Sequence, residues 1–440
     1  MIRRAASSFP VSGFLLSFLL LGAIPLLYAS EDGEGTSEEA ASDEEVGQAP
    51  AAPEAQQAKS RAEILREKRE QKSKELVPYE VSRWEARLRG WEKANFPSNW
   101  LVKGWNGFRP VLGGMPSGSG TVFGGGYIYG LGAQRIQAQA NARFSTKSYT
   151  QFDGEVIFPP PQDHRRIEFK FRAQKRDLKA LSFYGLGNET SVDEETSYQL
   201  KDTLVGGYAW LNPRGLLSFG AEGAFYRAET GSGTDSPSVE DVFPPFEIPG
   251  FRAPQTDYTV FGGWAEFDLR DKWEDPAVGV VARLTALRYD DTDLNLFGFT
   301  RYVGEVKGYV PLGPKSRVLA LRFRTSQSTS DSGDVVPFYL METLGGAQTI
   351  RGYSEFRFRD TKNLLLNVEY RWEVWTFADF AVFFDAGKVF EDDDDFNFEE
   401  LHTGYGFGIR GHAPGGMALR IDLAKSTEGF KIHFSGGPTF

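Results

Sequence analysis

In Ile167-Glu168-Phe169-Lys170-Phe171-Arg172-Ala173-Gln174, the fold of this chain is indicated by two sets of alternate residues that differ in polarity. One set is apolar and the other is charged or polar. Successive side chains of a strand point to opposite faces of a sheet, so this segment has one apolar and one charged face. A soluble sandwich would bury long apolar faces between short strands. Strands of about ten or more residues, apolar on one face and charged on the other, are typical of a transmembrane β-barrel.

The same alternation recurs at Asn363–Val374 and at Met417–Ala424. It predicts about sixteen strands, near residues 121–130, 133–145, 148–158, 165–176, 179–187, 195–211, 214–229, 256–270, 277–290, 295–312, 316–328, 362–375, 377–389, 403–412, 416–425 and 429–440. Short turns alternate with long loops at 230–255, 329–361 and 390–402, as in outer-membrane barrels. We therefore predict an all-β fold, a transmembrane antiparallel β-barrel whose even strand count returns both termini to the periplasmic side.

Composition excludes several classes of function. The 440 residues include no cysteine, 4 histidines and 49 glycines, and 14% of the chain is aromatic. The absence of cysteine excludes a disulfide framework, a thiolate metal site, a cysteine nucleophile and a lipid-modified cysteine. The formal net charge of −11 argues against a nucleic-acid partner. Abundant glycine and aromatic residues suit long strands joined by tight turns.

The chain before the predicted strands divides into three segments. A positive start and the apolar run Phe14–Tyr28 predict a signal peptide over residues 1–29. That run is short for a transmembrane helix, which needs about 20 residues. Residues 30–59 are acidic and poor in large apolar side chains, so we expect a disordered linker. Residues 60–112 are expected to form a helical periplasmic segment, and residues 113–440 the barrel.

An apolar stripe marks the second part of the predicted helical segment. Val81, Trp84, Leu88 and Trp91 are spaced by three and four residues. Such a stripe needs a surface to bind, which could be the barrel mouth, the lumen, the membrane surface or a periplasmic partner. After the signal peptide no apolar run is long enough to cross a bilayer as a helix, so a membrane-spanning mature chain must use a closed barrel.

Several motifs in the second part of the chain resemble a known family. The loop 329–361 contains Gly345-Gly346-Ala347-Gln348-Thr349-Ile350-Arg351-Gly352-Tyr353, and the strands after it contain Asn367-Val368-Glu369-Tyr370 and Phe383-Phe384-Asp385-Ala386-Gly387. Weaker matches are Tyr184–Asn188 and Asp268–Asp271. Over roughly 113–440 the chain resembles the surface-antigen (BamA/TamA-type) superfamily of outer-membrane assembly and translocation barrels. The resemblance implies that the loop folds back into the lumen and that Arg351 pins its tip to the barrel wall.

Three of these residues are connected by electrostatics, independently of the family. Glu369 and Asp385 lie on neighbouring predicted strands and face the lumen by alternation, so their carboxylates would repel each other. Arg351 can remove that cost, because a guanidinium binds carboxylates bidentately and stays protonated. We predict a lumenal loop clamp, which consists of Ile350, Arg351, Gly352, Tyr353, Glu369 and Asp385. The alternative is that these are ordinary lumenal charges and an ordinary loop.

Glycine and proline weaken the predicted first and last strands. We assign the barrel seam to Gly124, Gly125, Gly126, Gly436, Gly437 and Phe440, with Phe440 on the same face as Phe430, Ile432 and Phe434. Glycine weakens strand pairing, and Pro438 removes a ladder donor, so this contact should be the weakest in the barrel. In the family, this seam is proposed to open sideways. The glycines would equally serve the tight bends of a small barrel.

The function that we expect is that of a noncatalytic assembly or translocation factor for outer-membrane proteins or lipids. Its expected partners are outer-membrane lipid, client outer-membrane proteins and a periplasmic partner at the apolar stripe. No POTRA module is readable in residues 30–112, which departs from the family members that assemble proteins. The histidines are scattered, so we predict no catalytic residue, metal site or cofactor. The alternative function is a passive diffusion channel or a structural barrel.

Overall fold

The computed structural model describes residues 105–440, apart from 117, 132–135, 159–165, 213–214, 236, 274, 314–316, 376–377, 414–415 and 438–439. All of the described residues belong to one compact unit, Val81–Phe440. The predicted signal peptide, acidic linker and residues 60–104 of the helical segment lie outside the described residues, as do Val81, Trp84, Leu88 and Trp91. Within the described ranges, no helix combines the length and apolar character needed to cross a membrane.

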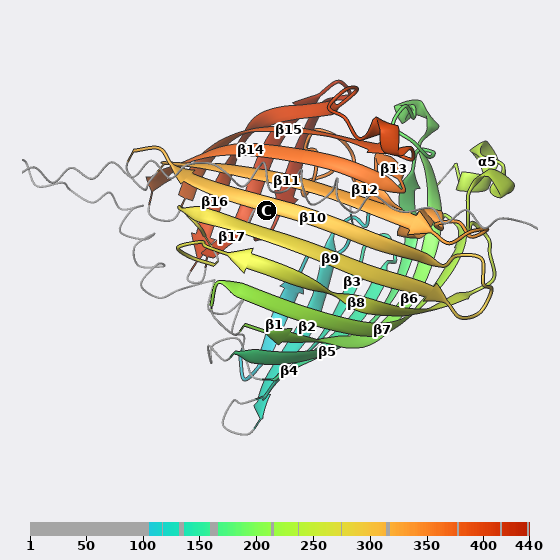
Figure 1. Ribbon diagram of the computed structural model, residues 1–440, viewed down its shortest axis with the longest axis horizontal. Coiled ribbons are helices and arrows are strands. Elements are labelled where there is room, and N and C mark those ends of the chain that lie inside the picture. Colours follow the sequence, from blue (N-terminus) through green and yellow to red (C-terminus); the bar gives the residue numbers. More distant parts are fainter. Residues whose placement is uncertain are drawn as a thin grey trace, which may run out of the picture. The chain divides into compact units, whose positions relative to one another are not determined.

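Sixteen antiparallel strands form one continuous sheet, in which neighbours follow the chain order, and the sheet curves into a barrel (Figure 1). The strands are β1 (Phe108–Leu112), β2 (Val122–Leu131), β3 (Ile136–Ser145), β4 (Thr150–Phe158), β5 (Ile167–Phe183), β6 (Thr196–Leu211), β7 (Leu217–Ser232), β8 (Thr256–Asp268), β9 (Gly279–Asp291), β10 (Phe299–Pro311), β11 (Arg317–Ser330), β14 (Lys362–Trp375), β15 (Ala378–Phe390), β16 (His402–Ala413), β17 (Gly416–Ser426) and β18 (Gly429–Ser435). The all-β antiparallel barrel predicted from the alternation is confirmed.

Most of the long connections lie at one end of the sheet, which we call the loop side, together with the short turns 146–149 and 427–428. The opposite end is the turn side, where most connections are short and the longest is 269–278. The connection between β11 and β14 contains β12 (Glu342–Leu344) and β13 (Phe358–Asp360), which pair as a separate small sheet. The helical elements are α5 (Val239–Val242) and short 3-10 helices at Val192–Glu194, Pro245–Glu247, Phe338–Leu340 and Asp393–Asp395.

Two strand predictions are wrong, and their errors cancel in the strand count. β1 lies at 108–112, inside the segment predicted as helical, so the barrel begins before residue 113. Its five residues include Pro110, so its alternation is too short to read from sequence. The strands predicted at 165–176 and 179–187 are the single strand β5. A register shift between Leu178 and Leu181 interrupts the two-residue period that the prediction used.

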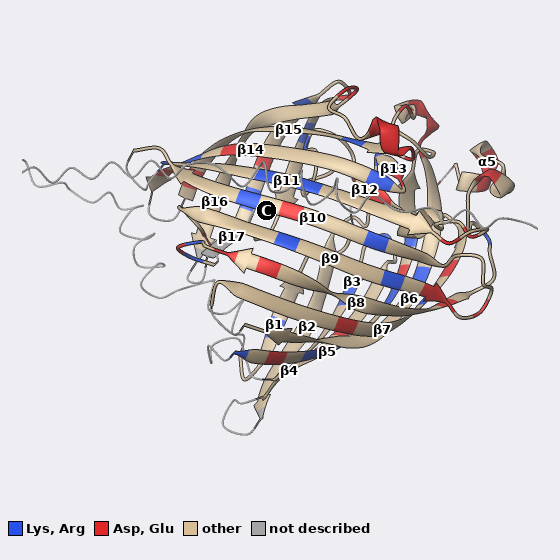
Figure 2. Cartoon of the chain, in the orientation of Figure 1, with Lys and Arg blue, Asp and Glu red and all other residues tan. Residues whose placement is uncertain are grey.

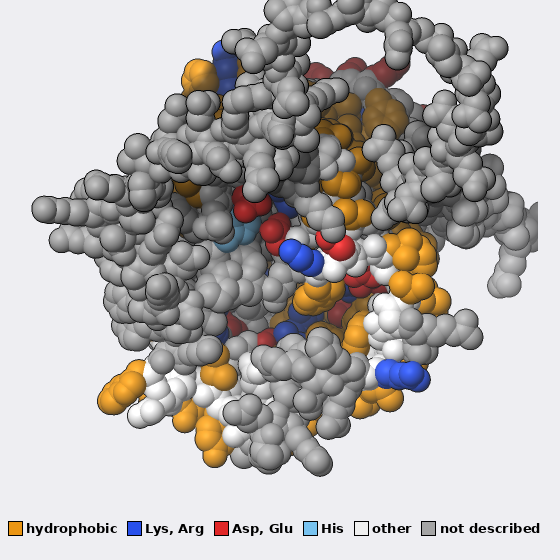
Figure 3. All heavy atoms as spheres, turned by 90° about the vertical axis from the view of Figure 1, so that its left-hand side faces the viewer, with side chains coloured by type: hydrophobic (Ala, Val, Ile, Leu, Met, Phe, Trp, Pro, Cys, Tyr) orange, Lys and Arg blue, Asp and Glu red, His pale blue; other side chains and the backbone are white. Residues whose placement is uncertain are grey.

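The two faces of the sheet differ in polarity as the alternation predicts. On β16, Tyr405, Phe407 and Ile409 are 51%, 50% and 51% exposed, whereas Arg410 on the opposite face is 0% exposed. Charged residues are spread along the strands as well as in the loops (Figure 2). From the turn side, charged and histidine side chains are visible inside the hollow, and hydrophobic ones along the outer margin (Figure 3). The apolar face therefore points outward and the charged face lines the lumen.

Aromatic side chains pack together at the loop side of the barrel. Phe338 is fully buried and makes ring contacts with Phe183, Tyr198, Phe251 and Tyr339. These residues belong to a larger apolar cluster, which also contains Val239, Ile248 and Tyr258. Because the cluster joins the ends of β5 to β8 with several long connections, the loops form a packed cap at this end.

Candidate functional site

The connection between β11 and β14 bends sharply at the start of the predicted clamp. Gly345 and Gly346 have φ angles of 111° and 90°, which only glycine adopts without strain. The Thr349 hydroxyl closes the bend by donating a 2.8 Å hydrogen bond to the Gly345 carbonyl. Ile350 is completely buried in an apolar cluster with Leu344, Tyr353, Phe358, Leu365 and Val389. This packing positions the next residue, Arg351, along the lumenal face of the strands.

Arg351 binds two carboxylates on neighbouring strands. Its Nε lies 2.7 Å from Oδ2 of Asp385, and its Nη2 lies 2.8 Å from Oδ1. Its Nη1 lies 2.7 Å from Oε2 of Glu369. The guanidinium also lies 3.4 Å from the ring centre of Phe383. All three charged side chains are buried, so the structure brings together the arginine and the two carboxylates of the predicted clamp.

The charged network extends beyond the predicted residues. Arg410 on β16 places Nη2 at 2.7 Å from Oε2 of Glu369, and Nη1 at 2.5 Å from Oδ1 of Asp422. Arg420 Nε lies 3.2 Å from Asp422 Oδ2, and Arg371 Nε lies 3.0 Å from Glu369 Oε1. The buried part of the network contains the cations Arg351, Arg371, Arg410 and Arg420 and the anions Glu369, Asp385 and Asp422. Each buried cation lies next to a buried anion, and this attraction compensates the desolvation cost of both charges.

Backbone groups of Gly352 fasten the loop to the last two strands. The Gly352 N–H donates a 3.1 Å hydrogen bond to Nε2 of His433 on β18. The Ser426 hydroxyl on β17 donates a 2.8 Å hydrogen bond to the Gly352 carbonyl. His433 accepts through Nε2, so its ring is neutral and carries its proton on Nδ1. Gly352 has a φ of 96°, which explains why glycine occupies this position.

Two more contacts join the loop to β17 and its following turn. Arg420 Nη2 donates a 2.6 Å hydrogen bond to the Ala347 carbonyl. The hydroxyls of Tyr353 and Thr427 are 3.0 Å apart. Arg351 binds side chains of β14 and β15, and these two contacts bind the loop to β17 and its turn. The loop therefore crosses the lumenal side of the last strands and connects them.

Alternate glycines on β16 make room for the loop. Gly404, Gly406 and Gly408 lie on the lumenal face of this strand. A Cβ atom at Gly404 would overlap the carbonyl oxygen of Arg351, and one at Gly408 would overlap the carboxylate of Asp422. The loop and the charged network therefore occupy the space that side chains at these positions would fill.

Arg410, Arg420, Asp422 and His433 belong to the site but were not predicted from the sequence. Alternation gives each of them an inward direction, and the glycines in Gly404-Tyr405-Gly406-Phe407-Gly408 were an unused sign of close packing on that face. The relative stagger of four strands decides which of the inward side chains contact one another. The periodicity of a single strand does not predict that stagger.

The predicted seam residues do not share an edge of the sheet. Gly124, Gly125 and Gly126 lie on β2, which pairs with both β1 and β3, so their assignment to the edge strand is wrong. The edge strands are β1 and β18, and within the described ranges no backbone ladder joins them. The undetected strand β1 is the reason for this error.

The C-terminal residues leave the sheet. β18 ends at Ser435, and Gly437 has a φ of 77°, which turns the chain away from the strand direction. Phe440 packs against the buried residues Tyr309, Val318 and Ala320, and its carbonyl accepts a 3.3 Å hydrogen bond from the Tyr309 hydroxyl. The prediction that Phe440 shares the outward face of Phe430, Ile432 and Phe434 is therefore wrong.

The charged network is chemically suited to holding the loop in one position. Its carboxylates and guanidinium groups are engaged with one another and lie away from solvent. In the part of the chain that the structure describes, no group of three or more His, Asp or Glu side chains is arranged to hold a metal ion.

Comparisons with known proteins show the family. The Omp85 superfamily domain matches residues 122–440. The crystal structure of BamA from Haemophilus ducreyi lacking POTRA domains 1–3 is similar over 76% of this chain and 70% of that one, with 15% identity and a TM-score of 0.55. CdiB from Escherichia coli is similar over 75% and 62%, with 11% identity and a TM-score of 0.49. No curated protein matches the sequence. The chain belongs to the Omp85 superfamily of outer-membrane β-barrels.

Proposed function

We propose that this protein is a noncatalytic assembly or translocation factor that helps outer-membrane proteins or lipids to enter or cross the outer membrane. Membership of the Omp85 superfamily supports the proposal, since members of this superfamily mediate the assembly or secretion of outer-membrane proteins. The observation that carries it is the pair of unjoined edge strands, β1 and β18.

The two edges are suited to receiving another strand. An edge strand presents unpaired N–H and C=O groups, which can pair with an extended segment of a second chain. β1 has only 5 residues, whereas β10 and β11 pair continuously from Phe299 to Pro311. A ladder that closed β1 on β18 would be short, so its replacement by a client strand would lose few hydrogen bonds.

The clamp supports this function by stiffening one side of the seam. Arg351, Arg420 and Gly352 connect the lumenal loop to β14, β15, β17 and β18. Among the described residues, no hydrogen bond or ion pair joins the lumenal loop 345–353 to β1 or β2. We therefore assign the movement that admits a client to β1 and its neighbours.

The packed lumen disfavours a passive diffusion channel. The loop 345–353 and Phe440 occupy space inside the sheet, and the aromatic cluster around Phe338 packs at the loop side. A solute would have to displace several of these packed groups. Planar-bilayer recordings test this alternative, because a stable and solute-permeant conductance in the wild type would favour the channel.

A disulfide staple tests the proposed function directly. The natural chain has no cysteine, so a pair introduced at Val111 and Lys431 would be the only one. We expect this staple between β1 and β18 to lower the levels of client outer-membrane proteins, and reductant to restore them. The control staple joins Val310 and Leu319, which are partners on β10 and β11. Normal client levels with the seam stapled, or after depletion of the protein, would contradict the proposal.

A further inference from the structure

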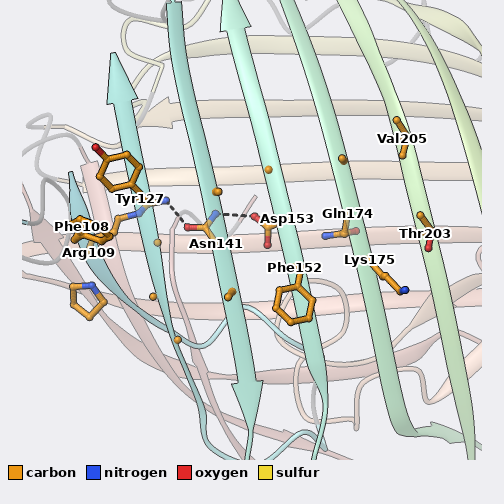
Figure 4. Close-up of a pocket in the computed structure, with 18 of the residues that line it drawn as sticks. Phe108, Arg109, Tyr127, Asn141, Phe152, Asp153, Gln174, Lys175, Thr203 and Val205 are labelled. Carbon is orange, nitrogen blue, oxygen red and sulfur yellow. Dashed lines mark hydrogen bonds between the residues drawn. The ribbon is translucent and has the colours of Figure 1, made fainter. Parts of the chain in front are cut away.

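A furrow of about 990 Å³ runs across the outer face of the sheet from β1 to β6 (Figure 4). Its floor consists of small residues in two cross-strand rows, namely Gly125 and Ala142 in one row, and Ala140, Gly154 and Ala173 in the other. The rings of Phe108 on β1 and Tyr127 on β2 lie at one side of this floor, with their centres 4.6 Å apart. Phe152 on β4 is the cross-strand partner of Ala142 and lies at the other side. The furrow is therefore a groove whose floor carries only small side chains and whose two sides are formed by aromatic side chains.

The register and the exposed fractions place this furrow outside the barrel. Phe108, Tyr127 and Phe152 are 64%, 37% and 49% exposed, whereas Asn141, which alternates with the floor residues, is buried. A Cβ atom added at Gly125 would meet no atom within 4 Å, so the space above the floor is open. In an outer-membrane barrel this face meets lipid hydrocarbon.

Two cations line the furrow, Arg109 and Lys175, and Arg109 donates hydrogen bonds to Gln139 and Asn141. Lys175 is the cross-strand partner of Phe152 and Thr203, and its side chain is exposed. Among the described residues no hydrogen bond or ion pair of Lys175 is found, whereas its outward neighbours Lys201 and Arg227 pair with Glu229 at 3.5 Å and Asp257 at 2.6 Å. A lysine on the lipid-facing surface is unfavourable unless an anion accompanies it or it reaches the membrane interface.

The height of Lys175 on the wall indicates which leaflet supplies the anion. Lys175 is the ninth of the 17 residues of β5. On its turn side the outward residues Phe171 and Ala173 are apolar, whereas the outward residues Asp177, Lys201 and Arg227, level with it or on its loop side, are charged. Lys175 therefore lies where the apolar band of the outer face ends, next to the membrane leaflet on the loop side.

We propose that the furrow binds a phosphate-bearing lipid of the loop-side leaflet. An acyl chain lies along Gly125, Ala142 and Gly154 between the aromatic side chains, and the lipid phosphate pairs with Lys175. An unbranched chain fits a floor of glycine and alanine, because close approach increases dispersion contacts. A peptide strand fits poorly, since β2 to β5 are paired on both sides and offer no free backbone groups. The inference requires only an outer-membrane barrel and does not rest on the proposed function.

Lipid binding to the full-length protein in detergent tests the inference. The probe is bis-phosphorylated lipid A, titrated by native mass spectrometry. We expect K175E and K175Q to bind it at least fivefold more weakly than wild type. Filling the floor with G125L or A142L should have a similar effect. Equal binding by wild type and all four variants would overturn the proposal.

Matched controls separate the furrow from the rest of the outer face. K425E changes another exposed lysine, which lies 5.2 Å from the Phe430 ring centre. G308L fills another glycine position at which an added Cβ would meet nothing within 4 Å. Both should bind lipid A as wild type does, and a loss in them equal to that in K175E would overturn the site assignment. Heat-modifiable electrophoretic mobility checks that each variant is folded.

Two further measurements distinguish the occupants. Lipid A without phosphate groups should bind wild type as weakly as lipid A binds K175E, and inorganic phosphate should not displace lipid A. Undiminished binding of the phosphate-free lipid, or full displacement by phosphate, would overturn the proposal. A photo-crosslinking residue in place of Ala142 should yield a lipid adduct. An adduct with residues 81–104 of this chain, or with another protein, would show a different occupant and overturn it.

Discussion

The guanidinium groups of Arg351 and Arg410 bind the same oxygen of Glu369, each at a distance of 2.7 Å. Arg351 belongs to the lumenal loop and Arg410 to the strand wall, so one buried carboxylate holds both. Each arginine also binds a second carboxylate, Asp385 or Asp422 respectively. The position of the loop is therefore coupled to the relative positions of β14, β15, β16 and β17.

The substitution Arg351→Ala should destabilise the barrel by on the order of 3 kcal/mol, because it leaves the buried carboxylate of Asp385 without its cation. Urea unfolding of the refolded protein, followed by tryptophan fluorescence, measures the change. Arg227→Ala is the matched control, since Arg227 binds Asp257 through two nitrogens at 2.7 and 2.6 Å on the exposed outer face. The control should cost clearly less than Arg351→Ala, because solvent screens an exposed ion pair. Equal losses in both variants would refute the role of burial.

Gly404→Ala should displace the lumenal loop although it removes no charge. The added Cβ would overlap the Arg351 carbonyl oxygen, and such overpacking costs about 1–3 kcal/mol. Limited proteolysis should then cut within residues 345–357 faster than in wild type. Gly411→Ala is the control on the same strand, because its Cβ would meet Leu419 only at ordinary distances of 3.6 and 3.7 Å. Unchanged cleavage of the Gly404 variant would show that the loop is not held against β16.

A double-mutant cycle on Arg410→Ala and Asp422→Ala should give a coupling energy of about 0.5–3 kcal/mol, because the two side chains are in contact within one network. Unfolding free energies of the wild type, both single variants and the double variant supply the cycle. Arg410→Ala combined with Asp257→Ala, on the outer face of β8, should be additive within about 0.5 kcal/mol. Additivity in the first pair would mean that the network does not act as a unit.

Replacing residues 346–355 with a short glycine-serine turn should increase ion conductance through the barrel. The change removes the loop that Arg351 holds across the lumen, and it leaves the strand ladders intact. Planar-bilayer recordings measure the conductance, with a shortened 391–397 loop as the control. A conductance equal to that of the wild type would show that the lumenal loop does not obstruct the barrel.

The sequence predicted the strand faces and the central part of the site, because both follow from local rules. Alternation assigns Glu369 and Asp385 to the lumenal face, and the electrostatics of two buried carboxylates then favours Arg351 as their partner. Local rules failed where a segment was short or irregular. Pro110 lies in a strand of 5 residues, and the register shift at Leu178 divided one strand into two.

The sequence was sufficient to show that extended segments present one face to lipid and the other to water, since a side chain's polarity and its place in the two-residue period are both local. The folded structure was needed to show that Arg410, Asp422 and His433 join the site, that β1 and β18 form the edges, and that Phe440 turns inward. Those contacts depend on strand stagger and on chain path, which result from the closure of the whole sheet.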